Sequence, residues 1–355
     1  MVPEPDPRLA GLVDLEAADE AIRTAAVAEL DRKTKPRGSL GRLEDLAAQV
    51  AAIRGLLRPE ALRAAIVVAA ADHGIAAEGV SAYPQEVTRQ MVANFAGGGA
   101  AVCVLARAAG AELVVVDAGI AEPFDHHDVR SIRVGPGTAN AVERPAMTRD
   151  QAVASILAGA AIASELADAG ITAVGVGEMG IGNTTSAAAL AAALLGGDPV
   201  ELCGPGTGLD ADGVARKAVV VARMLERNPP DPADPLGVLA AVGGFEIGVL
   251  VGVALGAATG HSVVVLDGFI TGAAALVALR LAPALHGFLV ASHRSAEPGH
   301  RVVLEALGLV PVLELDLRLG EGSGAALALP IVAAARDVLV DMATFSDAGV
   351  TDTGR

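Results

Sequence analysis

The segment Arg318–Gly324 places a single carboxylate, Glu321, between glycines, a pattern suited to acid–base chemistry. An apolar run precedes it and an Ala- and Leu-rich run, 325–339, follows it, so the pattern predicts a strand-to-helix junction. Glycine lets backbone, ligand and acid approach closely, and a lone acid on such a loop is a candidate general base. The residues alone leave open whether Glu321 is that base or a solvated acid near a helix start.

A second segment, Gly175–Gly180, reads G-x-G-x-x-G between an apolar run and a predicted helix. This pattern is typical of dinucleotide-binding folds and would favour an NAD(P)-dependent oxidoreductase. Two features argue against that class. Glu178 would stand in the loop that holds a pyrophosphate and would repel it, and the acid expected about twenty residues later is at best Asp198, in a Gly-Gly-Asp-Pro turn.

The segment Gly182–Ser186 begins a predicted helix and suits one phosphate, because free N–H groups, hydroxyls and the positive helix end meet there. An ordinary N-cap by Asn183 or Thr184 explains the same residues. Spacing leaves both interpretations open.

A third glycine-rich loop, Gly204–Asp210, leads into a helix that carries Arg216 and Lys217. Lys217 could reach a phosphate or a carboxylate. Without other support, we interpret the two residues as a solvated basic pair.

Histidine and serine patterns give little sign of a metal or of nucleophilic catalysis. Asp72-His73 could suggest a metal or a charge relay, but no second ligand cluster has a sensible spacing, so we predict no metal site. His293 and His300 are interpreted as structural or surface residues. The serines lack a G-x-S-x-G elbow, which leaves acyl transfer weakly supported. The single Tyr, Tyr83, precedes a predicted helix and could contact a flat ligand or simply pack.

Composition narrows the class of protein. The chain has 355 residues, of which 52% are hydrophobic, and its formal charge of −16 argues against nucleic-acid binding. Two distant cysteines exclude a disulfide scaffold and favour a reduced, cytoplasmic setting. The acidic, Pro-rich start is not a signal peptide. Glycines and Glu246 interrupt the apolar run 238–258, so we predict no clean membrane-spanning helix.

Short β-branched runs begin at residue 64 and alternate with helical patterns. Because most of these runs are apolar without alternation, they predict strands buried on both faces, as in a parallel sheet. The last run contains Pro311 and is followed by alternating acids, which suggests an edge strand. The predicted strands are 65–69, 113–116, 171–174, 263–266, 288–291 and 310–313.

Helical spacing fills the intervals between these runs, which predicts a doubly wound α/β domain with about six mostly parallel strands. The predicted helices are 15–31, 43–57, 84–97, 149–169, 185–195, 211–226, 236–256 and 271–281. Ligands of such sheets bind beyond the carboxyl ends of the strands. The chemically informative motifs follow the predicted strands, so we expect their loops to converge on one edge of the sheet.

Seven motifs in a fixed order give the chain a family resemblance. They are K-P-R-G-S-L-G-R-L-E (35–44), A-D-H-G (71–74), G-E-M-G-I-G-N-T-T (177–185), V-G-G-F-E (242–246), L-D-G-F (266–269), S-H-R-S-A-E (292–297) and R-L-G-E-G-S-G (318–324). Together they closely resemble nicotinate-nucleotide:dimethylbenzimidazole phosphoribosyltransferases of cobalamin lower-ligand assembly. The match runs from about residue 30 to about 345.

The resemblance implies a reaction without metal or other cofactor. The phosphoribosyl group of nicotinate mononucleotide passes to 5,6-dimethylbenzimidazole with inversion at C1′, giving α-ribazole 5′-phosphate and nicotinate. A non-catalytic nucleotide-binding protein of the same fold is the rival from another class. Such a protein would not need an acid at position 321.

The resemblance also implies the site residues. The family's general base corresponds to Glu321, and Glu178 is a second acid near the ribose or acceptor. The phosphoribosyl and nicotinate groups are expected at Gly180, Asn183, Thr184, Gly206, Lys217, Asp267, Gly268 and Ser295. The benzimidazole is expected at Tyr83, Gln90, Met91, Met179 and Leu319, where the match of Tyr83, Gln90 and Met91 is loose.

The resemblance further implies two domains and a homodimer. Residues 1–60 and 325–355 are expected to form a small helical domain built from both chain ends, and residues 61–324 a large α/β substrate-binding domain. The expected partners are the two small-molecule substrates and a second copy of the chain, with neither nucleic acid nor membrane, in the cytoplasm.

Overall fold

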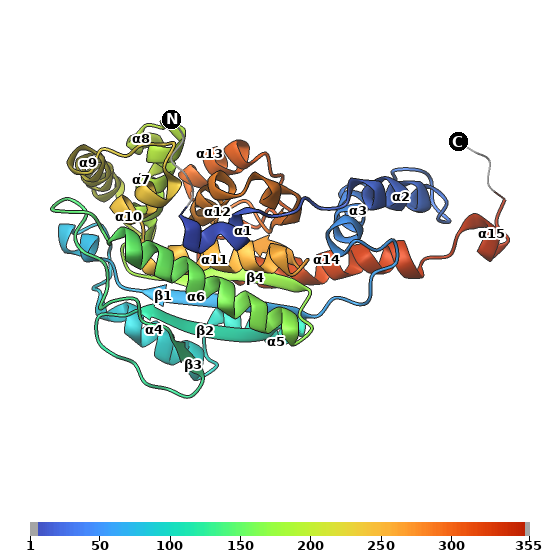
Figure 1. The fold of residues 1–355 in the computed structure, drawn as a ribbon, viewed down its shortest axis with the longest axis horizontal. Helices are drawn as coiled ribbons and strands as arrows, with labels where there is room; N and C mark the ends of the chain where they lie inside the picture. The colour runs from blue at the N-terminus through green and yellow to red at the C-terminus, as the bar shows by residue number, and fades with distance from the viewer. Residues whose placement is uncertain (1–5, 352–355) are drawn as a thin grey trace.

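The structure, a computed structural model, describes residues 6–351. These residues form a six-stranded parallel sheet with helices on both sides, shown in Figure 1. The strands are β1 (Ala64–Ala71), β2 (Glu112–Gly119), β3 (Val129–Ser131), β4 (Ala173–Met179), β5 (Val263–Leu266) and β6 (Leu289–Ala291). Their order, β3-β2-β1-β4-β5-β6, confirms the predicted doubly wound α/β fold and places the topological switch between β1 and β4.

Two helical layers cover the sheet. On one side α11 (Phe245–Thr259) and α12 (Phe269–Leu281) contact the strands, and α6 (Arg149–Asp168) packs against α11. On the other side α4 (Glu86–Ala96), α5 (Ala101–Ala109) and α14 (Ser323–Asp341) contact β1, β2 and β4. Because both faces are covered, the strands are buried and apolar, as a parallel sheet requires.

Small residues let the helices pack closely, which fits a chain with almost no aromatic side chains. The closest packing is between α6 and α11. A Cβ atom on Gly159 would collide with the backbone of Val249, and one on Gly252 with the backbone of Ile156. The core is therefore built by close backbone approach and aliphatic contacts.

The remaining helices include a group at one end of the molecule. Helices α2 (Glu20–Asp31) and α3 (Arg42–Arg54) pack together and against α14, and Figure 1 shows them near α15 (Phe345–Ala348). Lys33 Nζ donates to Met342 O at 2.8 Å, which ties the two chain ends together. The others are η1 (Pro7–Leu9), α1 (Ala10–Val13), η2 (Gly74–Glu78), α7 (Asn183–Leu195), α8 (Pro199–Leu202), α9 (Ala211–Arg227), α10 (Pro235–Val242), η3 (Pro283–Phe288) and α13 (Pro298–Leu307).

The predicted sixth strand, 310–313, is wrong. Only Leu313 makes an isolated parallel bridge, to His293. Pro311 has no N–H to donate to a strand ladder, and Asp316 soon turns the chain with a φ of 54°. The sixth strand of the sheet is instead β3, three residues long, whose sequence Val-Arg-Ser carries no apolar run.

One predicted helix, 236–256, is two helices. They are α10 and α11, and Gly243-Gly244 lies between them. A Cβ on Gly243 would stand 2.5 Å from Leu239 O, and a Cβ on Gly244 would collide with the ring of His73. The break therefore admits a histidine from the end of β1. Helices α5 and α13 were not predicted.

Two helical stretches of the described residues are long and apolar enough to cross a membrane, namely Glu86–Ala109 and Ser323–Asp341. The first contains the break between α4 and α5. The second is α14, which packs on β4 and β5 and has 56% of its most apolar window buried. Both stretches contact strands of the sheet, so we interpret their apolar residues as packing surfaces of the fold.

Candidate active site

Glu178 and Glu321 meet at the carboxyl edge of the sheet. Glu178 lies in β4 itself, paired with Ala69 of β1, so the predicted loop placement is wrong. Glu321 stands two residues before α14 and is 6% exposed. A Cβ on Gly320 would collide with the Glu178 carboxylate, which shows how closely the two acid-bearing segments approach.

The backbone at Glu321 is held in an unusual conformation. Gly320, Glu321 and Gly322 all have positive φ, at 83°, 64° and 84°. For Glu321 this left-handed conformation is strained, and the surrounding structure must maintain it. Its Oε2 is buried and has no hydrogen-bond partner among the described residues. The loop thus presents an unpaired carboxyl oxygen at the end of the sheet.

Gly177 in β4 makes this approach possible. A Cβ there would overlap the backbone of Glu321 and Gly322. At Gly175, two residues earlier on the same face of the strand, a Cβ would meet only side-chain atoms, Ala325 Cβ at 3.1 Å and Ile66 Cγ1 at 3.3 Å. The glycines of G-x-G-x-x-G therefore admit a neighbouring chain segment here.

Burial and like charges keep both acids in their neutral form to unusually high pH. Burial is the largest cause, and the charge of Asp267 the second, that raises the pKa of Glu178 to about 8. A hydrogen bond from Asn183 Nδ2 acts in the opposite direction. Burial and then the charge of Asp267 raise the pKa of Glu321 to about 7. Burial thus outweighs the helix N-terminus at Glu321, and near neutral pH this carboxyl can exchange a proton.

The start of α7 carries no side-chain cap among the described residues, so the interpretation of Asn183 or Thr184 as an ordinary N-cap is wrong. Asn183 donates to Glu178. Thr184 Oγ1 accepts from Lys217 Nζ at 2.8 Å, and the same ammonium donates to Gly204 O at 3.2 Å. Both side chains therefore link the helix start to other parts of the site and leave its first N–H groups free of side-chain caps.

Lys217 is buried, 1% exposed, so its interpretation as half of a solvated pair is wrong; Arg216 is exposed. Burial lowers the pKa of Lys217, while the charge of Glu297 raises it. On the helix α9, Lys217 faces inward and Arg216 outward, a distinction that the sequence Arg-Lys does not reveal. A buried ammonium beside the positive end of a helix favours the binding of anions.

Three loops are joined around Gly206. Gly206 N donates to Glu297 Oε1 at 2.8 Å, and Arg318 Nη1 donates to Gly206 O at 3.2 Å. Next to it, Thr207 Oγ1 is 2.9 Å from Ser81 Oγ. The glycine-rich loop therefore connects the segment before Tyr83 to the segment before Leu319.

The expected acceptor-binding residues are mixed in exposure. Tyr83 and Leu319 are each 55% exposed, and Gln90 is exposed, whereas Met91 and Met179 are half-buried. Gln90 lines a cavity of about 380 Å³ together with Asp72, Gln85, Glu86, Arg89, Ile120, Ala121 and Glu122. Neither Tyr83 nor Met91 lines it.

The loops after β5 and β6 lie side by side. Ser295 N donates to His300 Nδ1 at 2.9 Å, and Ser295 Oγ accepts from Glu297 N at 3.3 Å. A Cβ on Gly268 would lie 3.6 Å from His293 Cε1. His293 and His300 are thus buried structural residues, and burial lowers the pKa of His300 to about 3.

A buried chain of hydrogen-bonded side chains was missed by the sequence reasoning. His73 Nε2 is 2.6 Å from Glu246 Oε1, and His73 Nδ1 is 3.0 Å from Ser186 Oγ. All three side chains are buried. Asp72-His73 was noted as a possible relay, but its partners come from α7 and α11. Only the order of the motifs could have suggested that these segments meet.

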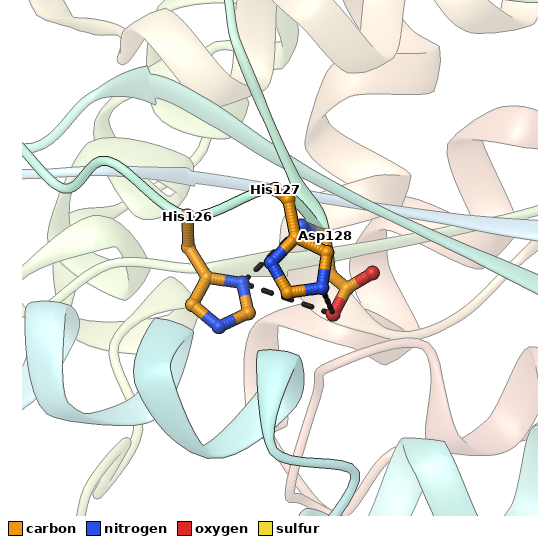
Figure 2. Close-up of side chains that lie close together, drawn as sticks. All are labelled: His126, His127 and Asp128. Carbon is orange, nitrogen blue, oxygen red and sulfur yellow. Dashed lines mark hydrogen bonds and ion pairs between the residues drawn. The ribbon is translucent and has the colours of Figure 1, made fainter.

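One histidine cluster was also missed. His126, His127 and Asp128 lie close enough to hold an ion, in the loop before β3, as Figure 2 shows. His127 Nε2 is 3.1 Å from Asp128 Oδ2, and His126 Nδ1 accepts from Asp128 N at 3.2 Å. Two of the three residues are exposed, and Asp128 N already donates to His126 Nδ1, so the cluster gives no reason to assign a metal.

Fold and site together define an α/β enzyme that holds ionisable acids beside the start of α7 and the buried Lys217, at the switch point of a parallel sheet. A family model described as phosphoribosyltransferase matches residues 15–350. The chain is 51% identical over 334 residues to the nicotinate-nucleotide–dimethylbenzimidazole phosphoribosyltransferase of Roseiflexus sp. (strain RS-1), covering 94% of this chain and 95% of the relative. The protein of that name from Solidesulfovibrio magneticus is 50% identical over 345 residues, covering 96% and 98%.

A solved structure agrees. The crystal structure of the nicotinate-nucleotide–dimethylbenzimidazole phosphoribosyltransferase from Thermus thermophilus matches with a TM-score of 0.89 and 48% identity, covering 94% of this chain and 99% of that chain. The chain belongs to this phosphoribosyltransferase family, which confirms the resemblance found in its motifs.

The close approach at Gly177 leads to a test. Gly177→Ala is expected to lower the free energy of unfolding by about 1–3 kcal/mol, because the new methyl group displaces the Glu321 backbone. Gly175→Ala is the matched control and is expected to cost clearly less, because its nearest neighbour, Ala325 Cβ at 3.1 Å, is much less crowded than Gly322 N, which would lie 2.3 Å from a Cβ at Gly177. Denaturant unfolding of both variants measures the difference, and equal losses would contradict the assigned packing.

Proposed function

We propose that this chain transfers the phosphoribosyl group of nicotinate mononucleotide to 5,6-dimethylbenzimidazole, giving α-ribazole 5′-phosphate and nicotinate. The names of its relatives support this reaction. The observation that carries it is Glu321, a buried carboxyl group with one unpaired oxygen and a pKa raised to about 7. A general base is most useful when its pKa lies near the working pH.

Glu321 is the proposed base for the ring N–H of the acceptor. One nitrogen of the benzimidazole attacks C1′ while the other carries the proton, and removing that proton raises the nucleophilicity of the ring and avoids a cationic product. The leaving group is a pyridinium nitrogen, so no acid need protonate it. Attack opposite the leaving group inverts C1′ from β to α, and holding the two substrates in line supplies much of the rate gain.

Glu178 is the proposed second acid. With a pKa of about 8 it is largely protonated at neutral pH, so it can donate a hydrogen bond to a ribose or acceptor oxygen or nitrogen. A neutral carboxyl group also avoids repelling the donor's phosphate. This removes the electrostatic objection raised by an acid inside a glycine-rich motif.

The proposed phosphate site is the start of α7 with Lys217. The N-terminal end of the helix and the buried ammonium are both positive, and Thr184 links them by accepting a hydrogen bond from Lys217. Gly180, Asn183, Gly206, Gly268 and Ser295 are proposed to line the phosphoribosyl group. The acceptor pocket is proposed at Tyr83, Gln90, Met91, Met179 and Leu319, which belong to the loop before α4, to α4 itself, to the end of β4 and to the loop before Glu321.

The rival functions lack support in the chain. In the dinucleotide fold that G-x-G-x-x-G suggested, the glycines form a loop after the first strand, whereas here they lie mostly within β4. A binding protein would gain nothing from an unpaired buried carboxyl group in strained backbone. The family relationship supports neither alternative.

We also propose the two-domain division and the homodimer that the resemblance implied. The proposed small domain comprises residues 1–60 and 325–355, which include α2, α3, α15 and most of α14, and the proposed large domain comprises residues 61–324. The location is proposed to be the cytoplasm. Sedimentation of the purified protein measures the assembly.

The assay of the reaction comes first. Mixing the protein with nicotinate mononucleotide and dimethylbenzimidazole, without metal, is expected to give α-ribazole 5′-phosphate and nicotinate, separated by chromatography and assigned by NMR. Glu321→Gln should retain the fold and lower turnover about a hundredfold or more, the range for loss of a general base. Glu305→Gln, an exposed acid on α13, is the control and should match the native protein. A Glu321→Gln variant with native turnover would refute the base.

Lys217 gives an independent test of donor binding. Lys217→Met keeps the apolar stem and removes the charge, and it is expected to raise the KM for nicotinate mononucleotide about tenfold or more, as loss of a charged hydrogen bond implies. Arg216→Met removes the exposed neighbouring charge and should leave KM within about twofold. Steady-state kinetics decide, and equal effects of the two variants would show that Lys217 does not contact the donor.

A further inference from the structure

Asp267 lies immediately after β5 and is 1% exposed. Its Oδ2 accepts from Gly322 N at 3.0 Å, and its Oδ1 accepts from Gly324 N at 2.6 Å and Ala325 N at 3.2 Å. The resemblance had suggested that Asp267 contacts a substrate. In the structure both of its oxygens are instead engaged by the backbone at the start of α14.

These bonds hold the segment that presents Glu321. Gly322, whose N–H Asp267 accepts, is the residue directly after Glu321 and the last of the three with positive φ. A strained backbone persists only where its surroundings fix it. Asp267 fixes it from the C-terminal side, while Ser323 Oγ donates back to Gly320 O at 2.8 Å.

Asp267 is also the charge that acts on both acids. The burial of each acid is the largest cause of its raised pKa, and the charge of Asp267 is the second largest, for Glu321 and for Glu178 alike. The other ionisable groups facing this cluster are Glu246, which acts on Glu178, and His293, whose Nδ1 lies 4.0 Å from Asp267 Oδ1. Burial lowers the pKa of His293, while the charge of Asp267 acts to raise it.

The protonation state of Asp267 follows from its contacts. Burial raises its pKa, and His293 with three backbone N–H groups opposes this. Every hydrogen bond recorded for Asp267 is accepted from an N–H donor, and the positive helix end favours an anion. We therefore assign the carboxylate form.

We propose that Asp267 is a positioning residue for the transfer reaction: it anchors the Glu321 loop to the end of β5 and supplies the fixed negative charge that keeps Glu321 ready to take a proton. It acts without touching a substrate. This inference rests on the proposed role of Glu321 as the base.

Two substitutions separate charge from shape. Asp267→Asn keeps the size and removes the charge, whereas Asp267→Glu keeps the charge and displaces the anchor by one methylene. The measurement is the pKa of the Glu321 carboxyl group by NMR of ¹³C-labelled glutamate, with the signal identified by its loss in Glu321→Gln. In Asp267→Asn the pKa is expected to fall by about one unit or more, the scale of one nearby charge at partly buried sites. In Asp267→Glu it should stay within about half a unit of the native value.

Asp117→Asn is the matched control. Asp117 is equally buried, at the end of β2, and accepts from Gly119 N and Ile120 N at 2.9 and 2.8 Å, but it does not act on the pKa of Glu321. It should leave the Glu321 titration unchanged. An unchanged pKa of Glu321 in Asp267→Asn, or the same shift in Asp117→Asn, would overturn the proposal.

Turnover is the second quantity to measure, and it separates the role of Asp267 from the role of Glu321 as the base. Both Asp267 variants are expected to lower kcat about tenfold or more with little change in the KM for nicotinate mononucleotide. If Asp267→Asn does not fold, Asp267→Glu decides, and native kcat in it overturns the anchoring role. If Glu321→Gln were fully active, the base assignment would fail, whereas the titration would still report on the charge of Asp267.

Discussion

Three carboxyl groups, those of Glu178, Asp267 and Glu321, are buried together at one edge of the sheet, and the site depends on this crowding. In water they would ionise independently near pH 4. Here burial and mutual repulsion raise the pKa of Glu321 to about 7 and that of Glu178 to about 8. Among the three, Asp267 alone accepts hydrogen bonds from three backbone N–H groups. We therefore assign the negative charge to Asp267, and this charge raises the pKa of both glutamates.

The fold produces this crowding through its topology. β1, β4 and β5 are adjacent, so the residues that end them lie within reach of one another. The sheet order reverses between β1 and β4, where open α/β sheets leave a crevice for ligands. Glycine at 177 then admits the loop that carries Glu321, and the buried anchor at Asp267 keeps it there. The same elements that hold the acids also present the α7 start and Lys217 to an anion.

The sequence predicted much of the fold, because buried parallel strands and amphipathic helices have strong local patterns, although β4 continues to Met179, beyond its predicted end at residue 174. It failed where the outcome depends on distant partners. The short β3 has no pattern of its own, and Val310–Leu313 has a strand pattern but only one bridge. Glu321 and Glu178 could be named from motifs, whereas the burial of Lys217 and the three N–H donors of Asp267 come from segments far apart in the chain.

The central claim, a carboxyl group kept neutral until about pH 7 by burial beside a like charge, makes a direct prediction for stability. The folded-state pKa of Glu321, about 7, lies above its ordinary value of 4.5. The resulting contribution to the free energy of unfolding is therefore fully present below pH 4.5 and is lost as the pH rises through 7. The measurement is the free energy of unfolding of the native protein and of Glu321→Gln at pH 5 and pH 8. The account predicts that the free energy of unfolding of Glu321→Gln minus that of the native protein is larger at pH 8 than at pH 5. An equal difference at the two pH values would contradict the account.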